Sequence, residues 1–417
     1  AAGQPITQGG AVYIHDGSNG VSVTNNNING NSGAYAGAVR VGTTYANGNI
    51  GANDTGAVPL TNYPQINQNV SIAHNYIYNN GGKNVAGGIG IFSGTPGYRI
   101  AFNDICGNYS AEYGGAISHY GFSRKGSIDH NRIWYNESYD HGGAILLGGE
   151  LTASPLELSG GTGEVNISSN KIDENNSNDD GGGISTLNAG TWPIKIENNE
   201  ITNNLSTHEG GGIALNNTTG LVLDNNTIAG NVTSATAATS NGMPAAAGLS
   251  TSALDQVFQA SLPAGSPTYT RPVAFNNVFW DNRAGWFDGA SVHGIGLTGD
   301  PAPINNWDVG SQDNSGNVPV NNSILQSCVG TTLNQDCSGS LGTNVNSNPQ
   351  FTKPYSLSVV VDTRRAFFAF RQTLIAYETV SPWDNADYSI KQTSPARDIG
   401  ATSLTDGGTT YTAPTVD

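Results

Sequence analysis

Four dipeptides that stand directly before glycine pairs hold the side chains best suited to chemistry. They are Glu112-Tyr113, Asp140-His141, Asp179-Asp180 and His208-Glu209. Equivalent residues of stacked β-strands lie about 4.8 Å apart, so glycine pairs at equivalent places in stacked units would gather these groups within about 15 Å. We therefore expect one column of five carboxylates and two imidazoles.

Such a column could hold a cation or carry out acid–base chemistry. Crowded carboxylates raise one another's pKa values, and a bound Ca²⁺ relieves the repulsion. The metal-ligand candidates are Glu112, Asp140, Asp179 and Asp180. Paired carboxyl groups also serve as the acid and base of glycosidases. The catalytic candidates are Asp140, His141, Asp179, Asp180, His208 and Glu209.

The competing interpretation of the same residues is turn chemistry. Asp and Glu before Gly-Gly are ordinary turn residues on a solvated edge. Turn propensity alone explains the acids, so we prefer this interpretation. The two histidines, His141 and His208, keep the site hypothesis open.

The elements that must position the column are marked by an asparagine signature, N-x-[IF]-x-x-N. Complete copies begin at Asn26, Asn75, Asn103, Asn131, Asn170, Asn199, Asn226 and Asn277, and a half-complete copy begins at Asn322. Copies without an insertion begin about 28 residues apart. A fixed period of about 20 to 50 residues is typical of a repeat architecture.

Each repeat has the pattern of short strands joined by tight turns. Stretches such as Val70-Ser71-Ile72 alternate before the asparagine, and a glycine pair follows it by 11 or 12 residues. Alternation bounded by Asn and Gly predicts strands, and parallel crossovers are almost always right-handed. We predict an all-β chain, a right-handed parallel β-helix of roughly nine or more coils with loop insertions and a C-terminal cap. The asparagines should take left-handed corners and bond the asparagines above and below, with the following Ile stacked inside.

Two motifs of this chain resemble those of a known group of proteins. The pairing of GGA[IV], as in Gly114 to Ile117, with [IF]-x-x-N, as in Phe279 to Asn282, is similar to the repeats of polymorphic outer-membrane proteins and to β-helix regions of large secreted bacterial surface proteins. Asn348 to Phe351 and Thr393 to Gly400 resemble the motifs that close such β-helices. The resemblance covers roughly residues 9 to 400. It implies a secreted or cell-surface bacterial protein and adhesion, but such motifs specify fold better than activity.

Composition narrows the class of partner. The 16 basic and 32 acidic residues give a net charge of −16, which disfavours nucleic acid and anionic lipid and favours cations or neutral sugars. No run of 18 apolar residues occurs, so we expect no membrane span. Cys328 and Cys337 flank a short loop and are expected to form a local disulfide of an exported protein, with two unrelated thiols as the alternative. Cys106 is expected to be a lone packed thiol.

The chain divides into a solenoid and its end. We expect residues 1–345 to form the β-helix and 346–417 to form a C-terminal capping region continuous with it. Three insertions depart from the period, and such loops often flank a binding face. They are residues 42–66, 148–163 and 232–270. Leu254 to Phe258 fits a helical turn, and Asp362 to Tyr377 fits either an amphipathic capping helix or two edge strands.

Aromatic side chains gather in the first third of the chain and could stack on sugar rings. The ligand-binding candidates are Tyr78, Tyr120, Trp134 and Tyr135. Tyr78 and Trp134 should align with Cys106 between them, and His74 and His130, each before a ladder asparagine, should share an outward column. Tyr is also a favourable strand residue, so a structural role is the alternative.

Function is less sharply indicated than fold. The arginine and aspartate cluster of pectate lyases, the motif series of polygalacturonases, and phosphate-loop, nucleophile-elbow and zinc motifs are all missing. The chain opens almost directly with a repeat, Gly9-Gly10-Ala11-Val12. We expect a mature product, a piece of a longer polypeptide, or a chain whose open end stacks on another protein.

Our preferred hypothesis is an extracellular structural or adhesive module, part of a larger cell-surface or matrix assembly. Its partners would be polysaccharide or another surface protein, with self-assembly through the open coil end. The alternative is a polysaccharide lyase or glycoside hydrolase that uses the acidic column. In an enzyme we expect a groove over the column, walled by the 148–163 and 232–270 insertions.

Overall fold

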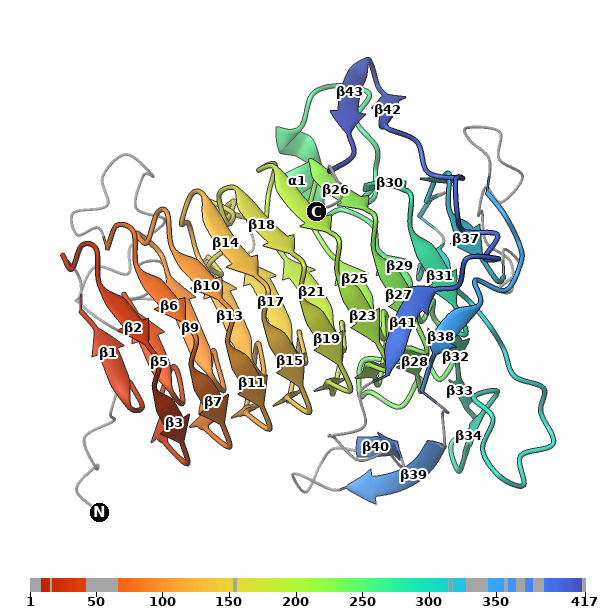
Figure 1. Cartoon of the computed structure of the whole chain (residues 1–417), viewed down its shortest axis with the longest axis horizontal. Coiled ribbons are helices and arrows are strands. Elements are labelled where there is room, and N and C mark those ends of the chain that lie inside the picture. Colours follow the sequence, from red (N-terminus) through yellow and green to blue (C-terminus); the bar gives the residue numbers. More distant parts are fainter. Residues whose placement is uncertain are drawn as a thin grey trace.

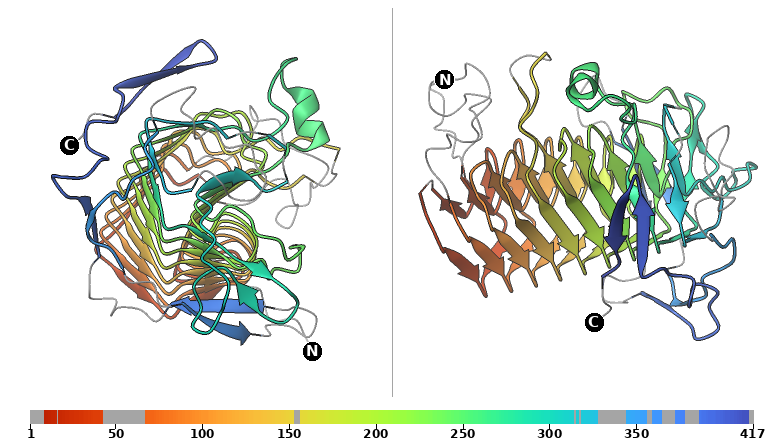
Figure 2. Two further views of the ribbon diagram at one scale, coloured as in Figure 1. Left: turned by 90° about the vertical axis from the view of Figure 1, so that its right-hand side faces the viewer. Right: turned by 90° about the horizontal axis from the view of Figure 1, so that it is seen from above.

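The polypeptide forms an elongated solenoid of short parallel strands (Figure 1). The computed structural model describes residues 9–15, 17–42, 67–152, 156–313, 315–316, 318–327, 344–355, 359–364, 372–377 and 386–414. Their strands build four long parallel sheets, here named A to D, and every complete coil visits the four in turn. The predicted right-handed parallel β-helix of about nine coils is confirmed (Figures 1 and 2).

The four sheets run the length of the stack. Sheet A holds β1 (Val12–Ile14), β5 (Val39–Val41), β9 (Ile89–Phe92), β13 (Ile117–Tyr120), β17 (Ile145–Gly148), β21 (Ile184–Leu187), β25 (Ile213–Leu215), β29 (Leu249–Thr251) and β35 (Val309–Ser311). Sheet B holds β2 (Ser22–Thr24), β6 (Ser71–Ala73), β10 (Arg99–Ala101), β14 (Gly126–Asp129), β18 (Val165–Ser168), β22 (Ile194–Glu197), β26 (Leu221–Asp224), β30 (Val273–Phe275) and β36 (Val320–Asn321). Sheet C holds β3 (Asn27–Asn29), β7 (Tyr76–Tyr78), β11 (Asp104–Cys106), β15 (Arg132–Trp134), β19 (Lys171–Asp173), β23 (Glu200–Thr202), β27 (Thr227–Ala229), β31 (Val278–Trp280) and β37 (Ile324–Leu325). Sheet D holds β4 (Ser32–Gly33), β8 (Gly81–Gly82), β12 (Tyr109–Ser110), β16 (Glu137–Ser138), β20 (Asn176–Ser177), β24 (Leu205–Ser206), β28 (Val232–Thr233) and β32 (Arg283–Ala284).

Aliphatic columns fill the interior because alternate strand residues point inward. The central residue of each signature does so on sheet C, where Ile77, Ile105 and Ile133 pair in register and are fully buried. Burying one such side chain contributes about 1.5–3 kcal/mol, so no single repeat is stable alone but the stack is.

Two asparagine ladders tie the coils together at the ends of sheet C. The first ladder runs from Asn26 to Asn277 and the second from Asn31 to Asn282, one rung per coil. In each, Nδ2 donates to Oδ1 of the next coil at 2.9–3.1 Å. The predicted ladder is therefore confirmed, and it is double.

The left-handed corner lies one residue earlier than predicted. The residue before a ladder asparagine has positive φ, as in His74 (56°), Phe102 (55°) and His130 (55°), whereas the ladder asparagines do not. The expectation that the ladder asparagine itself takes the left-handed conformation is wrong. Its side chain must point along the stack to bond its neighbours, so the preceding residue turns the corner.

The helical segment of the 232–270 insertion and the described C-terminal strands lie outside the coil cross-section (Figure 2). The 232–270 segment is an insertion only in part, because it also supplies β28 to sheet D and β29 to sheet A. The expected helical turn is confirmed as α1 (Gln256–Ser261), the one helix among the described residues. The described parts of Asp362 to Tyr377 match the alternative of two edge strands, with β39 (Val359–Arg364) antiparallel to β40 (Gln372–Tyr377). No described helix is long and apolar enough to cross a membrane.

Three further antiparallel pairs flank the later coils. They are β33 (Trp286–Phe287) with β34 (Val292–His293), β38 (Phe351–Lys353) with β41 (Asp387–Ile390), and β42 (Ser403–Asp406) with β43 (Thr409–Thr412). Tyr388 packs with Ala229 beside sheet C, and Leu404 and Tyr411 pack against Phe275 of sheet B. Cys328, Cys337 and nearly all of the 42–66 insertion lie outside the described residues, whereas Cys106 is a free, half-buried thiol as expected.

Candidate functional site

The acidic and histidine residues form one column at the turn from sheet D to sheet A. Backbone bonds between coils hold them in register, with Asp140 N donating to Glu112 O (2.8 Å) and His208 N to Asp179 O (3.1 Å). The glycine that follows each dipeptide is required, because Gly142 has φ 71° and an added Cβ would lie 2.6 Å from the Ile145 carbonyl oxygen. The predicted alignment of the column is confirmed.

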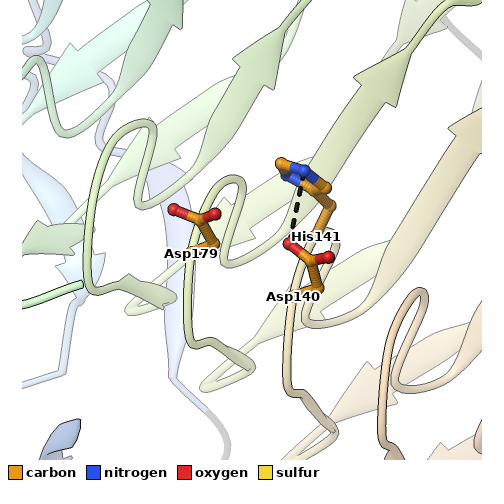
Figure 3. A group of neighbouring side chains, drawn as sticks. All are labelled: Asp140, His141 and Asp179. Atoms are coloured by element: carbon orange, nitrogen blue, oxygen red, sulfur yellow. Dashed lines mark ion pairs between the residues drawn. The ribbon is translucent and has the colours of Figure 1, made fainter. Parts of the chain in front are cut away.

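Within the column, each imidazole lies between carboxylates. His141 Nε2 is 3.3 Å from Asp140 Oδ1 (Figure 3), and its Nδ1 is 3.4 Å from Asp180 Oδ2. His208 Nδ1 is 2.8 Å from Asp180 Oδ1 and 3.3 Å from Asp179 Oδ1. Asp180 therefore bridges the two histidines, and the five side chains form one ion network.

Electrostatics favour the protonated histidines. Burial opposes charge on His208, but hydrogen bonds to Asp179 and Asp180 outweigh it and raise the pKa of His208 to about 11. Burial likewise lowers the pKa of His141, and the charges of Asp180 and Asp140 reverse this, so that the pKa of His141 is raised overall. The aspartates thus favour the protonated form of each imidazole, which offsets part of their negative charge.

Two glutamates at the margins of the column have raised pKa values. Burial and the charge of Asp180 raise the pKa of Glu209 to about 8, and its Oε2 accepts a 2.6 Å hydrogen bond from Ser250 Oγ. Burial and the charge of Asp140 raise the pKa of Glu112. The protonated form of Glu209 therefore predominates at neutral pH.

The donor atoms could also hold a metal, in two overlapping triplets whose atoms lie within 4.8 Å of one another. The triplets are Asp140, His141 and Asp179, and Asp179, Asp180 and His208. Glu112, a predicted ligand, belongs to neither triplet. Ca²⁺ takes 6–8 oxygen ligands, whereas mixed nitrogen and oxygen donors suit zinc-like ions. Either ion would first have to displace the proton that the aspartates hold on His208.

Other side chains cover the end of the column. Thr239 Oγ1, from the 232–270 insertion, donates to Asp179 Oδ1 at 2.6 Å, and Gln312 Nε2 lies 3.2 Å from His208 Nε2. The 148–163 insertion and α1 instead line a cavity of about 360 Å³. Asn188 and Asn217 also line it, and they follow the C-terminal ends of the sheet A strands, whereas the column precedes the N-terminal ends. The groove that these two insertions wall is therefore away from the column.

The predicted aromatic ligands have different environments. Tyr78 is half-buried and accepts a 2.9 Å bond from Asn27 Nδ2, and Tyr135 packs 5.3 Å from Trp134. Trp134 aligns with Tyr78 across Cys106 as predicted, but it is 8% exposed and its Nε1 donates to Asp104. Tyr120 is 3% exposed and packs on Phe92, so the expectation that it lies at the surface is wrong. Tyr120 ends strand β13 and lies in a buried apolar cluster with Val85, Phe92 and Leu146.

An outward stack of rings, here called the aromatic ridge, consists of His74, Phe102 and His130. The ring centroids are 5.0 and 4.8 Å apart, with interplanar angles of 3° and 26°. Phe102 is 42% exposed, and a shallow hollow of about 450 Å³ lies beside the ridge. Sequence reasoning found the two histidines and missed Phe102, although it too precedes a ladder asparagine.

Comparisons with protein-family models, with curated proteins and with solved structures found no match. The functional interpretation therefore rests on the geometry of this chain.

Proposed function

We propose that this chain is a non-catalytic extracellular module that adheres to polysaccharide through the side of its solenoid. The observation that carries the proposal is the contrast between the column and the aromatic ridge. The column's imidazoles pair with its aspartates and offset part of their charge, and its end is partly covered, whereas the ridge holds Phe102 open to solvent. Chemistry needs a group that faces a substrate, and adhesion needs exposed rings.

The ridge has a feature that turn formation alone does not require. A bulky residue with positive φ is a conformational outlier that costs about 1–3 kcal/mol. Phe102 adopts φ 55° at a corner where the equivalent positions in other coils hold Asn198 and Asn225. Asn favours this conformation, so an exposed Phe there gives up stability for an accessible ring.

The surroundings of the ridge suit a neutral, hydroxyl-rich polymer. The Arg99 guanidinium lies 5.4 Å from the Phe102 ring, and the Asp129 carboxylate holds it with bonds of 3.0 and 2.5 Å. Asp129 thus neutralises the Arg99 guanidinium, which stays beside the Phe102 ring. Sugar rings offer apolar faces to aromatics and hydroxyls to such polar groups.

The resemblance to polymorphic outer-membrane protein repeats supports the same proposal through its implication of adhesion at a bacterial cell surface. Secretion or surface display, with assembly through the first coil, belongs to the proposal as well. A polysaccharide lyase or hydrolase that uses the acidic column is the alternative, and the pairing of Asp140 with His141 and of Asp179 with His208 argues against it.

Co-sedimentation with insoluble neutral polysaccharides tests the proposal. Phe102→Asn removes the ring and relieves the backbone, so it should bind about tenfold more weakly, equivalent to about 1.4 kcal/mol, while melting no lower than the wild type. Tyr109→Asn is the matched control, because Tyr109 is 40% exposed on sheet D and lies outside the ridge. Release of soluble sugar by the wild type, abolished in Asp179→Asn, would establish the enzyme instead.

A further inference from the structure

A second cavity lies between the outer side of sheet C and the C-terminal strands. β38 and β41 pair there beside β27 and β31 (Figure 1). Lys171 Nζ donates to the Ala386 carbonyl at 3.1 Å, and Asn203 Nδ2 donates to the Tyr388 hydroxyl at 3.2 Å. These bonds join residues 215 and 185 positions apart and fix the C-terminal wall against the solenoid.

The cavity measures about 430 Å³ and combines flat rings with amide groups. Trp280, Tyr355 and Tyr388 supply the rings, and Asn203, Gln350 and Lys391 supply polar groups. Small-molecule sites have volumes of about 300–1,000 Å³ and are built from an apolar wall with a few convergent polar groups. The cavity therefore has the size and composition of a ligand site.

One buried polar atom in the wall lacks a partner. Asn203 is 2% exposed, and its Oδ1 makes no hydrogen bond within the described residues. An unsatisfied buried acceptor costs about 1–3 kcal/mol, so a ligand donor would be favourable here. The neighbouring Tyr388 hydroxyl accepts bonds from Asn203 Nδ2 and Tyr355 N, which leaves its own proton for donation.

We infer that this cavity binds one neutral pyranose unit, with a ring face on the aromatic wall and a hydroxyl between Asn203 and Tyr388. A sugar hydroxyl both donates and accepts, so one group satisfies the Asn203 oxygen and the Tyr388 proton together. The ring face stacks on Trp280 or Tyr355, whose hydroxyl Asp173 Oδ2 holds at 3.3 Å.

Charge in the wall argues for a neutral ligand. Asp281 and Lys391 are the two charged residues that line the cavity, and they are of opposite sign, so the wall has no net charge that would select an ionic ligand. The inference goes beyond the proposed function, because the cavity shares no residue with the aromatic ridge and could be occupied whether or not the ridge adheres.

Calorimetric titration of the full chain with methyl glucoside, methyl galactoside, methyl N-acetylglucosaminide and glucuronate tests this site. We expect at least one neutral glycoside to bind with a Kd near or below about 1 mM, about −4 kcal/mol. Tyr388→Phe, which keeps the ring, should weaken it about tenfold, and Tyr411→Phe, packed on sheet B, should leave it unchanged.

The absence of binding by every neutral glycoside at about 10 mM would overturn the inference. So would a Tyr388→Phe variant that binds as tightly as the wild type, or glucuronate that binds about tenfold better than every neutral glycoside. Lys391→Ala serves as a second variant should Tyr388→Phe unfold, because Lys391 is exposed. It should weaken neutral glycosides measurably, and unchanged binding by a folded Lys391→Ala would also contradict the site. Loss of polysaccharide sedimentation in Phe102→Asn with intact glycoside binding would separate this site from the ridge.

Discussion

Replacing His208 by Asn removes the cation that Asp179 and Asp180 share, and its cost can be worked from the structure. The pKa of His208 is raised from 6.5 to about 11, and 1.36 kcal/mol per pH unit sets an upper bound of about 6 kcal/mol on the stabilisation. His208 is 15% exposed, so solvent screening lowers this, and loss of one partner from a buried ion pair typically costs about 3–5 kcal/mol. We therefore expect His208→Asn to lower the free energy of unfolding by about 3–5 kcal/mol below pH 6.5.

The sign of the pH dependence follows from the raised pKa. The stabilisation is complete below the unfolded-state pKa of 6.5 and is lost as pH rises toward about 11. At pH 9.5 about 2 of the upper bound of about 6 kcal/mol remains, so the gap between wild type and His208→Asn should shrink by about two thirds. Urea unfolding at pH 6 and 9.5 measures this gap.

The matched control is His74→Asn, an exposed imidazole at a left-handed corner, which should change stability by less than about 1 kcal/mol. A loss below about 1 kcal/mol in His208→Asn at pH 6, or a gap that widens with pH, would refute the ion-network interpretation.

Further predictions concern the ladders, the column and the buried glutamate. Asn136→Ala removes the hydrogen-bond partner of Asn108 and of two buried carbonyls, so it should lower the free energy of unfolding in urea by about 3–5 kcal/mol. Asn26→Ala, at the exposed first rung, should lower it by about 1 kcal/mol, and equal losses in the two variants would contradict a stabilising role of the buried rungs. Addition of Ca²⁺ should leave the wild-type melting temperature within about 1 °C, because the imidazoles already occupy the aspartate oxygens. A rise of several degrees that Asp179→Asn removes would reveal a calcium site. The pKa of Glu209 is raised to about 8, so the free energy of unfolding should fall as pH rises from about 4.5 through 8. Glu209→Gln should flatten this fall, and an unchanged profile in the variant would show that another group titrates.

The sequence predicted those features that repeat along the chain. Each asparagine of the signature recurs at a fixed place, so the ladders, the stacked Ile105 and Ile133 and the alignment of Asp140 with Asp179 could be read from spacing. The corner was misplaced by one residue because spacing does not say whether Asn103 or Phe102 takes positive φ.

Features that depend on contacts between distant segments were not predicted. Tyr120 appeared to be a surface ring, yet packing against Phe92 buries it. The sugar cavity needs Tyr388 to reach Asn203 across 185 residues of sequence, and no local pattern reports that approach. The raised pKa of Glu209 likewise arises from burial by other coils, not from its neighbours in the chain.

We propose that the solenoid adheres to polysaccharide without cleaving it. The most direct measurement incubates the wild type with an insoluble neutral polysaccharide and follows, in one tube, the bound protein and the new reducing ends. We predict protein in the pellet, reduced about tenfold by Phe102→Asn, and no reducing ends above background. Reducing ends that accumulate with time and disappear in Asp179→Asn would contradict the claim.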